Sequence, residues 1–88
     1  MSEYRIAESA IFEKVGDEMV ILNMDDGQYY GLDEIGCRML ELIQAHGDID
    51  PVVQQLVVEY DTTADTLRAD LLALLSQLQQ HSLVLMHA

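Results

Sequence analysis

Residues 25–36 read Asp25-Asp26-Gly27-Gln28-Tyr29-Tyr30-Gly31-Leu32-Asp33-Glu34-Ile35-Gly36, and they combine a turn, a short strand and the start of a helix. Asp26-Gly27 can adopt the positive φ angles of a tight hairpin turn, and Tyr29-Tyr30 is typical of a strand. The apolar run Met19 to Met24 is therefore expected to be the central strand and to pair antiparallel with Gln28 to Leu32. The edge strand of such a sheet has unpaired N–H and C=O groups that can bind an extended peptide.

The segments on either side of this hairpin also have recognisable patterns. Ile6 to Val15 indicates one or two short extended pieces before a turn at Gly16-Asp17. Apolar residues at helical spacing predict a first helix over Asp33 to His46, with Asp33 as its N-cap and Gly47 as its stop.

Two more helices are expected in the second half of the chain. Asp50 is the expected N-cap of the second helix, with Pro51 in its first helical position. Thr63 is the expected cap of the third helix, whose apolar stripe is predicted to be Leu67, Leu71, Leu74 and Leu78. Leu83 to Met86 is expected to be extended and to return along either the third helix or the sheet.

This order of elements predicts an α+β fold, with an N-terminal three-stranded antiparallel sheet followed by three α-helices in a single domain of residues 1–88. The short connection Asp61-Thr62-Thr63 favours a winged helix-turn-helix arrangement. In DNA-binding proteins of that shape the later helix enters the major groove, but here Arg68 is its cation against Asp65 and Asp70.

Composition argues against several classes of function. Four Lys and Arg against 16 Asp and Glu give a net charge of −12, which would repel nucleic-acid phosphates and anionic membrane surfaces. Cys37 is the lone cysteine, so no internal disulfide can form, and Met1 leads into charged residues without an apolar signal segment. No apolar run approaches the roughly 20 residues that span a bilayer. The expectation is a cytoplasmic protein that binds neither nucleic acid nor membrane.

Metal and catalytic chemistry are not expected. His46, His81, His87 and Cys37 lack the close paired spacing of a structural metal site. The sequence has no strained nucleophile turn and no glycine-rich phosphate loop, and a chain of 88 residues leaves little room for an enclosed active site. We expect no catalytic residue, no metal and no cofactor.

Five segments occur in a specific order and spacing: Met19 to Leu22, Asp26 to Leu32, Asp33 to Gly36, Glu59 to Asp61, and Leu67 to Leu75. In these segments, over most of its length, the chain resembles the PqqD-like family of precursor-peptide recognition domains (RiPP recognition elements). These domains serve the biosynthesis of ribosomally made, post-translationally modified peptides (RiPPs). The resemblance implies that a leader peptide adds a strand to the sheet edge, with its side chains in a groove walled by the third helix. It also implies that the domain carries out no chemistry itself.

The Tyr29-Tyr30-Gly31-Leu32 form is similar to the stand-alone B1 proteins of lasso-peptide clusters. That resemblance implies two partners, a precursor whose leader often bears a Tyr-x-x-Pro element and a separate cysteine-protease-like leader peptidase. Two segments depart from the family pattern. Met39 and Leu40 stand where members often have a large aromatic residue, and Met24 to Gly27 replaces the proline-containing segment of the protein that gives the family its name.

On this interpretation, backbone groups of Gln28 to Leu32 would bind the peptide strand. Alternation places Tyr30 and Leu32 on one face and Tyr29 and Gly31 on the other. Leu32 is expected in the core, and Tyr30 is expected either in the pocket floor or in the core. On the third helix, one flank contains Arg68, Leu72 and Leu75 and the other contains Asp70 and Leu74, and either flank can wall the groove. The candidate peptide-binding residues are Val20, Leu22, Gln28, Tyr29, Tyr30, Gly31, Leu32, Arg68, Asp70, Leu71, Leu72, Leu74 and Leu75.

Two other functions stay open at this point. One is a winged-helix transcriptional regulator whose DNA contact comes from a partner subunit, and the other is a non-catalytic enzyme subunit that stabilises a catalytic chain. A homodimer formed through free sheet edges also stays open.

Overall fold

The structure is a computed structural model that describes residues 3–87. It has an α+β fold with three helices and antiparallel sheets, as predicted. The sheets divide into a three-stranded one, in the order β2-β3-β4, and a two-stranded one formed by β1 and β5. The elements are β1 (Glu3–Ile6), β2 (Ala10–Val15), β3 (Glu18–Asn23), β4 (Tyr29–Leu32), α1 (Glu34–His46), α2 (Ile49–Glu59), α3 (Ala64–Gln80) and β5 (Val84–His87).

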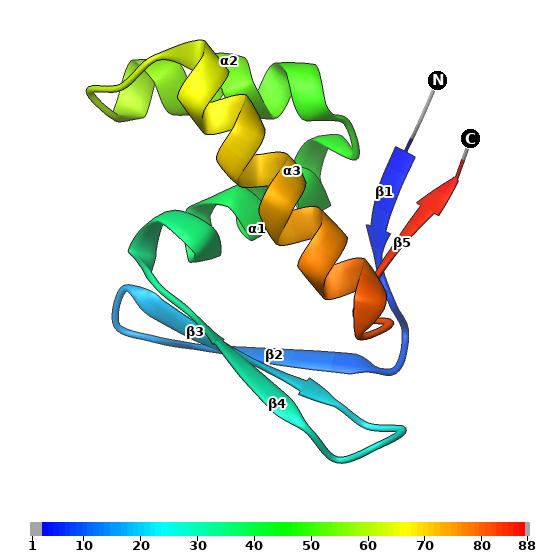
Figure 1. The fold of residues 1–88 in the computed structure, drawn as a ribbon. Coiled ribbons are helices and arrows are strands. Elements are labelled where there is room, and N and C mark those ends of the chain that lie inside the picture. Colours follow the sequence, from blue (N-terminus) through cyan, green and yellow to red (C-terminus); the bar gives the residue numbers. More distant parts are fainter. Residues whose placement is uncertain (1–2, 88) are drawn as a thin grey trace.

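The three-stranded sheet has the predicted centre. β3 pairs antiparallel with β2 on one side and with β4 on the other, and Ile21 lies opposite both Phe12 and Tyr30. Gly16 and Gly27 turn the two hairpins with φ angles of 63° and 75°, a region that residues with a Cβ rarely adopt. In Figure 1 the three helices lie together on one side of this sheet.

The prediction of one N-terminal sheet was incomplete. β5 follows the helices and pairs with β1, and Ala7 N donates a hydrogen bond of 2.9 Å to Leu83 O just beyond this pair. Figure 1 shows β1 (blue) and β5 (red) side by side near the C-terminal end of α3, apart from the three-stranded sheet. The pairing joins segments about 80 residues apart in the chain, so no local pattern predicts it.

Helix α1 begins and ends where local signals predicted. Asp33 is its N-cap, and the Asp33 carboxylate accepts a hydrogen bond from Gly36 N at 2.8 Å. Gly47 follows the helix with a φ of 73°, and its N–H bonds to Ile43 O at 2.7 Å.

The predicted N-cap of α2 was wrong by two residues. Asp48 is extended and caps the helix, accepting a hydrogen bond from Ile49 N at 2.7 Å, while Asp50 lies inside the first turn. Pro51 is consequently the third helical residue. Proline fits there because the first N–H groups of a helix have no partner within it.

Helix α3 begins after Thr63, as predicted, but its core stripe differs at one position. Leu67, Leu71, Leu75 and Leu78 are buried, whereas Leu74 is half-buried. The helix is therefore rotated slightly from the predicted orientation, and Leu74 lies on the flank of the stripe. The core between the helices and the inner face of β3 contains the largest fully buried side chains, which are Ile21, Leu40, Ile43, Leu56, Leu71, Leu75 and Leu83.

Candidate peptide-binding edge and groove

The free edge of β4 presents the backbone groups of two residues. Asn23 N donates a hydrogen bond to Gln28 O at 2.8 Å, and in an antiparallel ladder such pairs alternate. Tyr30 and Leu32 therefore direct their N–H and C=O groups toward β3, and Tyr29 and Gly31 direct theirs outward. In the described part of the chain no strand other than β3 pairs with β4. Of the predicted backbone run Gln28 to Leu32, Tyr29 and Gly31 are the residues whose groups are available at this edge.

A groove of about 480 Å³ lies on the helix side of this edge. One wall comes from the end of β4, the floor comes from the first turns of α1, and the other wall comes from α3. Four of the predicted residues meet here, namely Gly31 and Leu32 from β4 with Asp70 and Leu74 from α3. The other lining residues are Asp33, Ile35, Gly36 and Met39.

Close packing at the N-terminus of α1 shapes the floor of the groove. A Cβ added to Gly36 would lie 3.2 Å from the Asp33 Oδ1 atom and 3.4 Å from the Leu32 Cβ atom. The missing side chain lets the first turn of the helix approach the end of β4. Sequence reasoning did not assign Ile35 or Gly36 to the site. The available signal was the exposed apolar residue Ile35 in the first turn of an otherwise amphipathic helix.

The opposite flank of α3 lies away from the groove. Arg68 forms an ion pair of 2.8 Å with Asp50 and lines a hollow between α2 and α3. Leu72 follows one turn later on the same flank and is 43% exposed. Leu71 and Leu75 are buried in the core. The flank with Asp70 and Leu74 is therefore the one that walls the groove.

Tyr30 connects β4 to the C-terminal end of α3 rather than lining the groove. Its hydroxyl lies 2.9 Å from Gln28 Oε1 and 2.8 Å from His81 Nδ1, and its ring centroid is 4.4 Å from that of His81. Asn23 supports the same junction by donating a hydrogen bond of 2.9 Å to His81 O. Sequence reasoning missed both Asn23 and His81 here. A lone asparagine within an apolar strand was the available signal.

Val20 and Leu22 lie on the outer face of the sheet, opposite the groove. They pair with Gly31 and Tyr29, and the side chain of Tyr29 is 71% exposed on this face. The structure thus brings together part of the predicted set at the groove and places the rest in the core, on the outer face or on the far flank of α3.

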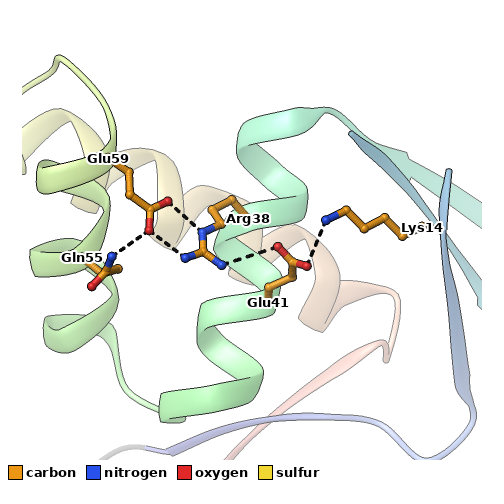
Figure 2. A network of polar contacts seen from close by, with 5 residues as sticks. All are labelled: Lys14, Arg38, Glu41, Gln55 and Glu59. Atoms are coloured by element: carbon orange, nitrogen blue, oxygen red, sulfur yellow. Dashed lines mark hydrogen bonds and ion pairs between the residues drawn. The ribbon is translucent and has the colours of Figure 1, made fainter. Parts of the chain in front are cut away.

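A polar network on the other side of α1 ties the fold together (Figure 2). Arg38 donates two hydrogen bonds of 2.7 Å to Glu59 on α2, and Lys14 on β2 contacts Glu41 at 3.3 Å. The hydrogen bonds from Arg38 and Gln55 lower the pKa of Glu59 to about 2, and Glu59 in turn raises the pKa of Arg38. None of these side chains lines the groove, so their role is structural.

The structure gives no sign of an activated group. Cys37 is buried, and this burial raises the pKa of its thiol, which opposes formation of the reactive thiolate. Within residues 3–87, no three His, Cys, Asp or Glu side chains are grouped so that they could hold a metal ion. Among the described helices, none has the length and apolar character needed to cross a membrane.

An α+β domain with an open edge strand beside a helix-walled groove can bind an extended peptide by strand addition. The sequence model of coenzyme PQQ synthesis protein D (PqqD) matches residues 18–84, and the chain belongs to this family. A comparison with curated proteins gives no match.

Two solved structures are similar to this fold over nearly its whole length. The first, TbiB1 in complex with the TbiA(β) leader peptide, is 28% identical, with a TM-score of 0.86 over 91% of this chain and 93% of that chain. The second, lasso peptide synthetase B1 complexed with the leader peptide, is 22% identical, with a TM-score of 0.87 over 94% of this chain and 98% of that chain. The second likeness supports the fold alone.

Proposed function

We propose that this chain binds the leader region of a ribosomally made precursor peptide in lasso-peptide biosynthesis, by adding the leader as a strand to β4. The observation that carries the proposal is the free edge of β4 directly beside a groove lined by α1 and α3. Membership of the PqqD family and the likeness to TbiB1, whose structure contains a leader peptide, support it.

Binding would combine backbone pairing with side-chain burial. The N–H and C=O groups of Tyr29 and Gly31 offer four hydrogen bonds, each worth about 0.5 to 1.5 kcal/mol net. Such bonds do not distinguish sequences, so the groove would supply specificity. An apolar leader side chain fully buried there would contribute about 1.5 to 3 kcal/mol. Asp70, at the rim, would pair with a leader cation or accept a hydrogen bond from a leader hydroxyl.

Fluorescence polarisation with labelled leaders encoded near the gene tests this proposal. Leu74→Gln should weaken binding at least tenfold because Leu74 lines the groove, whereas Leu72→Gln on the opposite flank should leave affinity unchanged. Circular dichroism of both variants checks that the fold is intact. The absence of binding at tens of micromolar for every leader, or an equal effect of the two substitutions, would contradict the proposal.

The chain would act without catalysis, as a single domain of residues 1–88 in the cytoplasm. It would present the leader to a separate cysteine-protease-like leader peptidase or to a modifying enzyme. Leader cleavage by the co-encoded peptidase should therefore accelerate when this chain is added. The same addition should have no effect on a substrate that lacks the leader.

We infer that α2, the connection from Tyr60 to Thr63 and α3 form a helix-turn-helix unit of the winged type. Charge argues against a DNA-binding role for it. Arg68 is the cation of α3, and it is engaged with Asp50 in a chain of net charge −12. Binding to duplex DNA at moderate salt would favour a transcriptional regulator instead. Activity of a partner enzyme on a leaderless substrate that still depends on this chain would favour a stabilising subunit.

Homodimers formed through the β4 edge would use the same backbone groups of Tyr29 and Gly31 as the leader. The two interactions would exclude each other. If such dimers form, saturating leader should convert them into monomeric complexes, which analytical ultracentrifugation can detect.

A further inference from the structure

The end of β4 lies between two hollows. One is the groove described above, and the other, of about 420 Å³, lies on the outer face of the sheet. The two share Gly31, Leu32 and Asp33. The side chains that distinguish the outer hollow are Val15, Glu18 and Val20, which alternation and pairing place on the face turned away from the helices.

Gly31 leaves this outer hollow open. Its φ does not lie in the left-handed region, unlike those of Gly16, Gly27 and Gly47 among the described glycines. A Cβ built on Gly31 meets no atom within 4 Å. Neither backbone conformation nor crowding therefore requires glycine here. Its consequence is an unfilled space next to Val20, its cross-strand partner, at the border of the sheet.

Strand alternation decides which side of a bound peptide enters each hollow. If a leader pairs antiparallel with β4, the residue opposite Gly31 projects its side chain to the outer face, over Gly31 and Val20. Its two neighbours in the leader project to the other face, toward the groove. Consecutive leader residues would thus be read on opposite faces of one edge strand.

The walls of the outer hollow define the chemistry of its occupant. Val15 and Val20 are 62% and 40% exposed, and they provide an apolar surface. Carboxylates of Glu18 and Asp33 border it, and Asp33 already accepts a hydrogen bond from Gly36 N. In the part of the chain that the structure describes, Glu18 makes no ion pair. An apolar floor beside a free carboxylate suits a long aliphatic side chain that ends in a cation.

We propose that the hollow over Gly31 is a second specificity subsite, which binds a lysine or arginine of the leader. The aliphatic stem lies on Val20 and Val15, and the cationic end pairs with Glu18. This inference rests on the proposed function, because it needs a leader strand on β4.

The experiment uses a leader that binds in the polarisation assay, together with versions in which each Lys or Arg is replaced singly by Ala. Gly31→Val fills the hollow and should weaken binding by roughly fivefold or more, since the stem loses its apolar contact. Glu18→Gln should weaken binding about two- to fivefold, with the loss diminishing at high salt. Asp61→Asn, which removes the same charge from the connection between α2 and α3, is the matched control and should have no effect.

The decisive result is a double-mutant cycle. One cation in the leader should account for both effects, so that replacing it by Ala makes Gly31→Val and Glu18→Gln silent. If Gly31→Val weakens binding while no leader cation couples to Glu18, the cationic occupant is wrong. If Gly31→Val and Gly31→Ala both leave affinity unchanged, there is no subsite here. Failure of every leader to bind would instead contradict the proposed function.

Discussion

Asn23 is a buried polar side chain, 3% exposed, and both ends of its amide are satisfied. Its Nδ2 donates to His81 O and its Oδ1 accepts from Asp25 N, each at 2.9 Å. This one residue therefore closes the β3–β4 turn and attaches it to the end of α3. A buried hydrogen-bonded amide of this kind is costly to remove because its partners lose their bonds.

Asn23→Ala should reduce the free energy of unfolding by about 1 to 3 kcal/mol, since it leaves the His81 carbonyl without its partner. Urea denaturation followed by circular dichroism measures this change. Met24→Ala is the control, because its exposed side chain should change stability by no more than about 0.5 kcal/mol. Equal losses for the two variants would show that the Asn23 bonds do not stabilise the fold.

At the scale of elements, the start of α2 can be checked directly. Asp48→Ala removes the observed N-cap and should destabilise the protein by about 0.5 to 2 kcal/mol. Asp50→Ala removes an exposed ion pair with Arg68 and should cost about 0 to 1 kcal/mol. Thermal denaturation ranks the two variants, and a larger loss for Asp50→Ala would move the cap to the position that the Pro51 pattern first suggested.

The end of β4 and the start of α1 form the element pair that positions the site. Asp33 caps α1 and also lines both hollows, so a change there affects stability and binding together. Asp33→Asn keeps a capping side chain and should retain stability within about 0.5 kcal/mol. Asp33→Ala should lose about 0.5 to 2 kcal/mol of stability. If leader affinity falls equally in both variants, the charge of Asp33 rather than the cap contributes to binding.

At the scale of the whole molecule, the Glu59 network predicts how stability depends on pH. The pKa of Glu59 is lowered from 4.5 in an unperturbed carboxyl to about 2 in the folded protein. The stabilisation is therefore complete above about pH 4.5 and is lost as the pH falls toward 2. Glu59→Gln should be less stable than the unchanged protein at pH 7, and the difference should shrink at pH 2.5. Denaturant midpoints at the two pH values measure it, and a difference independent of pH would exclude this linkage.

The single-domain prediction can be tested with probes in different parts of the molecule. Far-ultraviolet circular dichroism follows the helices, tyrosine fluorescence follows β4, and thiol labelling follows the buried Cys37. One cooperative core should give coincident thermal transitions for all three probes. Loss of the β4 signal before the helical signal would show that the three-stranded sheet unfolds as a separate unit.

The groove itself was predictable only in part. Strand alternation gives the faces of Tyr29 to Leu32, but the flank of α3 that meets them depends on how the helix is rotated about its axis. Successive helical residues are separated by about 100°, so a shift of one position exchanges Leu74 for Leu75 in the core. That rotation follows from packing against α1 and α2, which α3's own periodicity does not contain.

Local signals in the sequence determined the order of the elements, the β3–β4 hairpin and both ends of α1. Each of these depends on residues within a few positions of one another, such as Gly27 at its turn and Asp33 at its cap. Tertiary structure alone decided the β1–β5 pairing, the position of Asp70 and Leu74 on the groove, and the contact of Tyr30 with His81. These features join side chains that are distant in the chain, and their geometry is set by how the core packs as a whole.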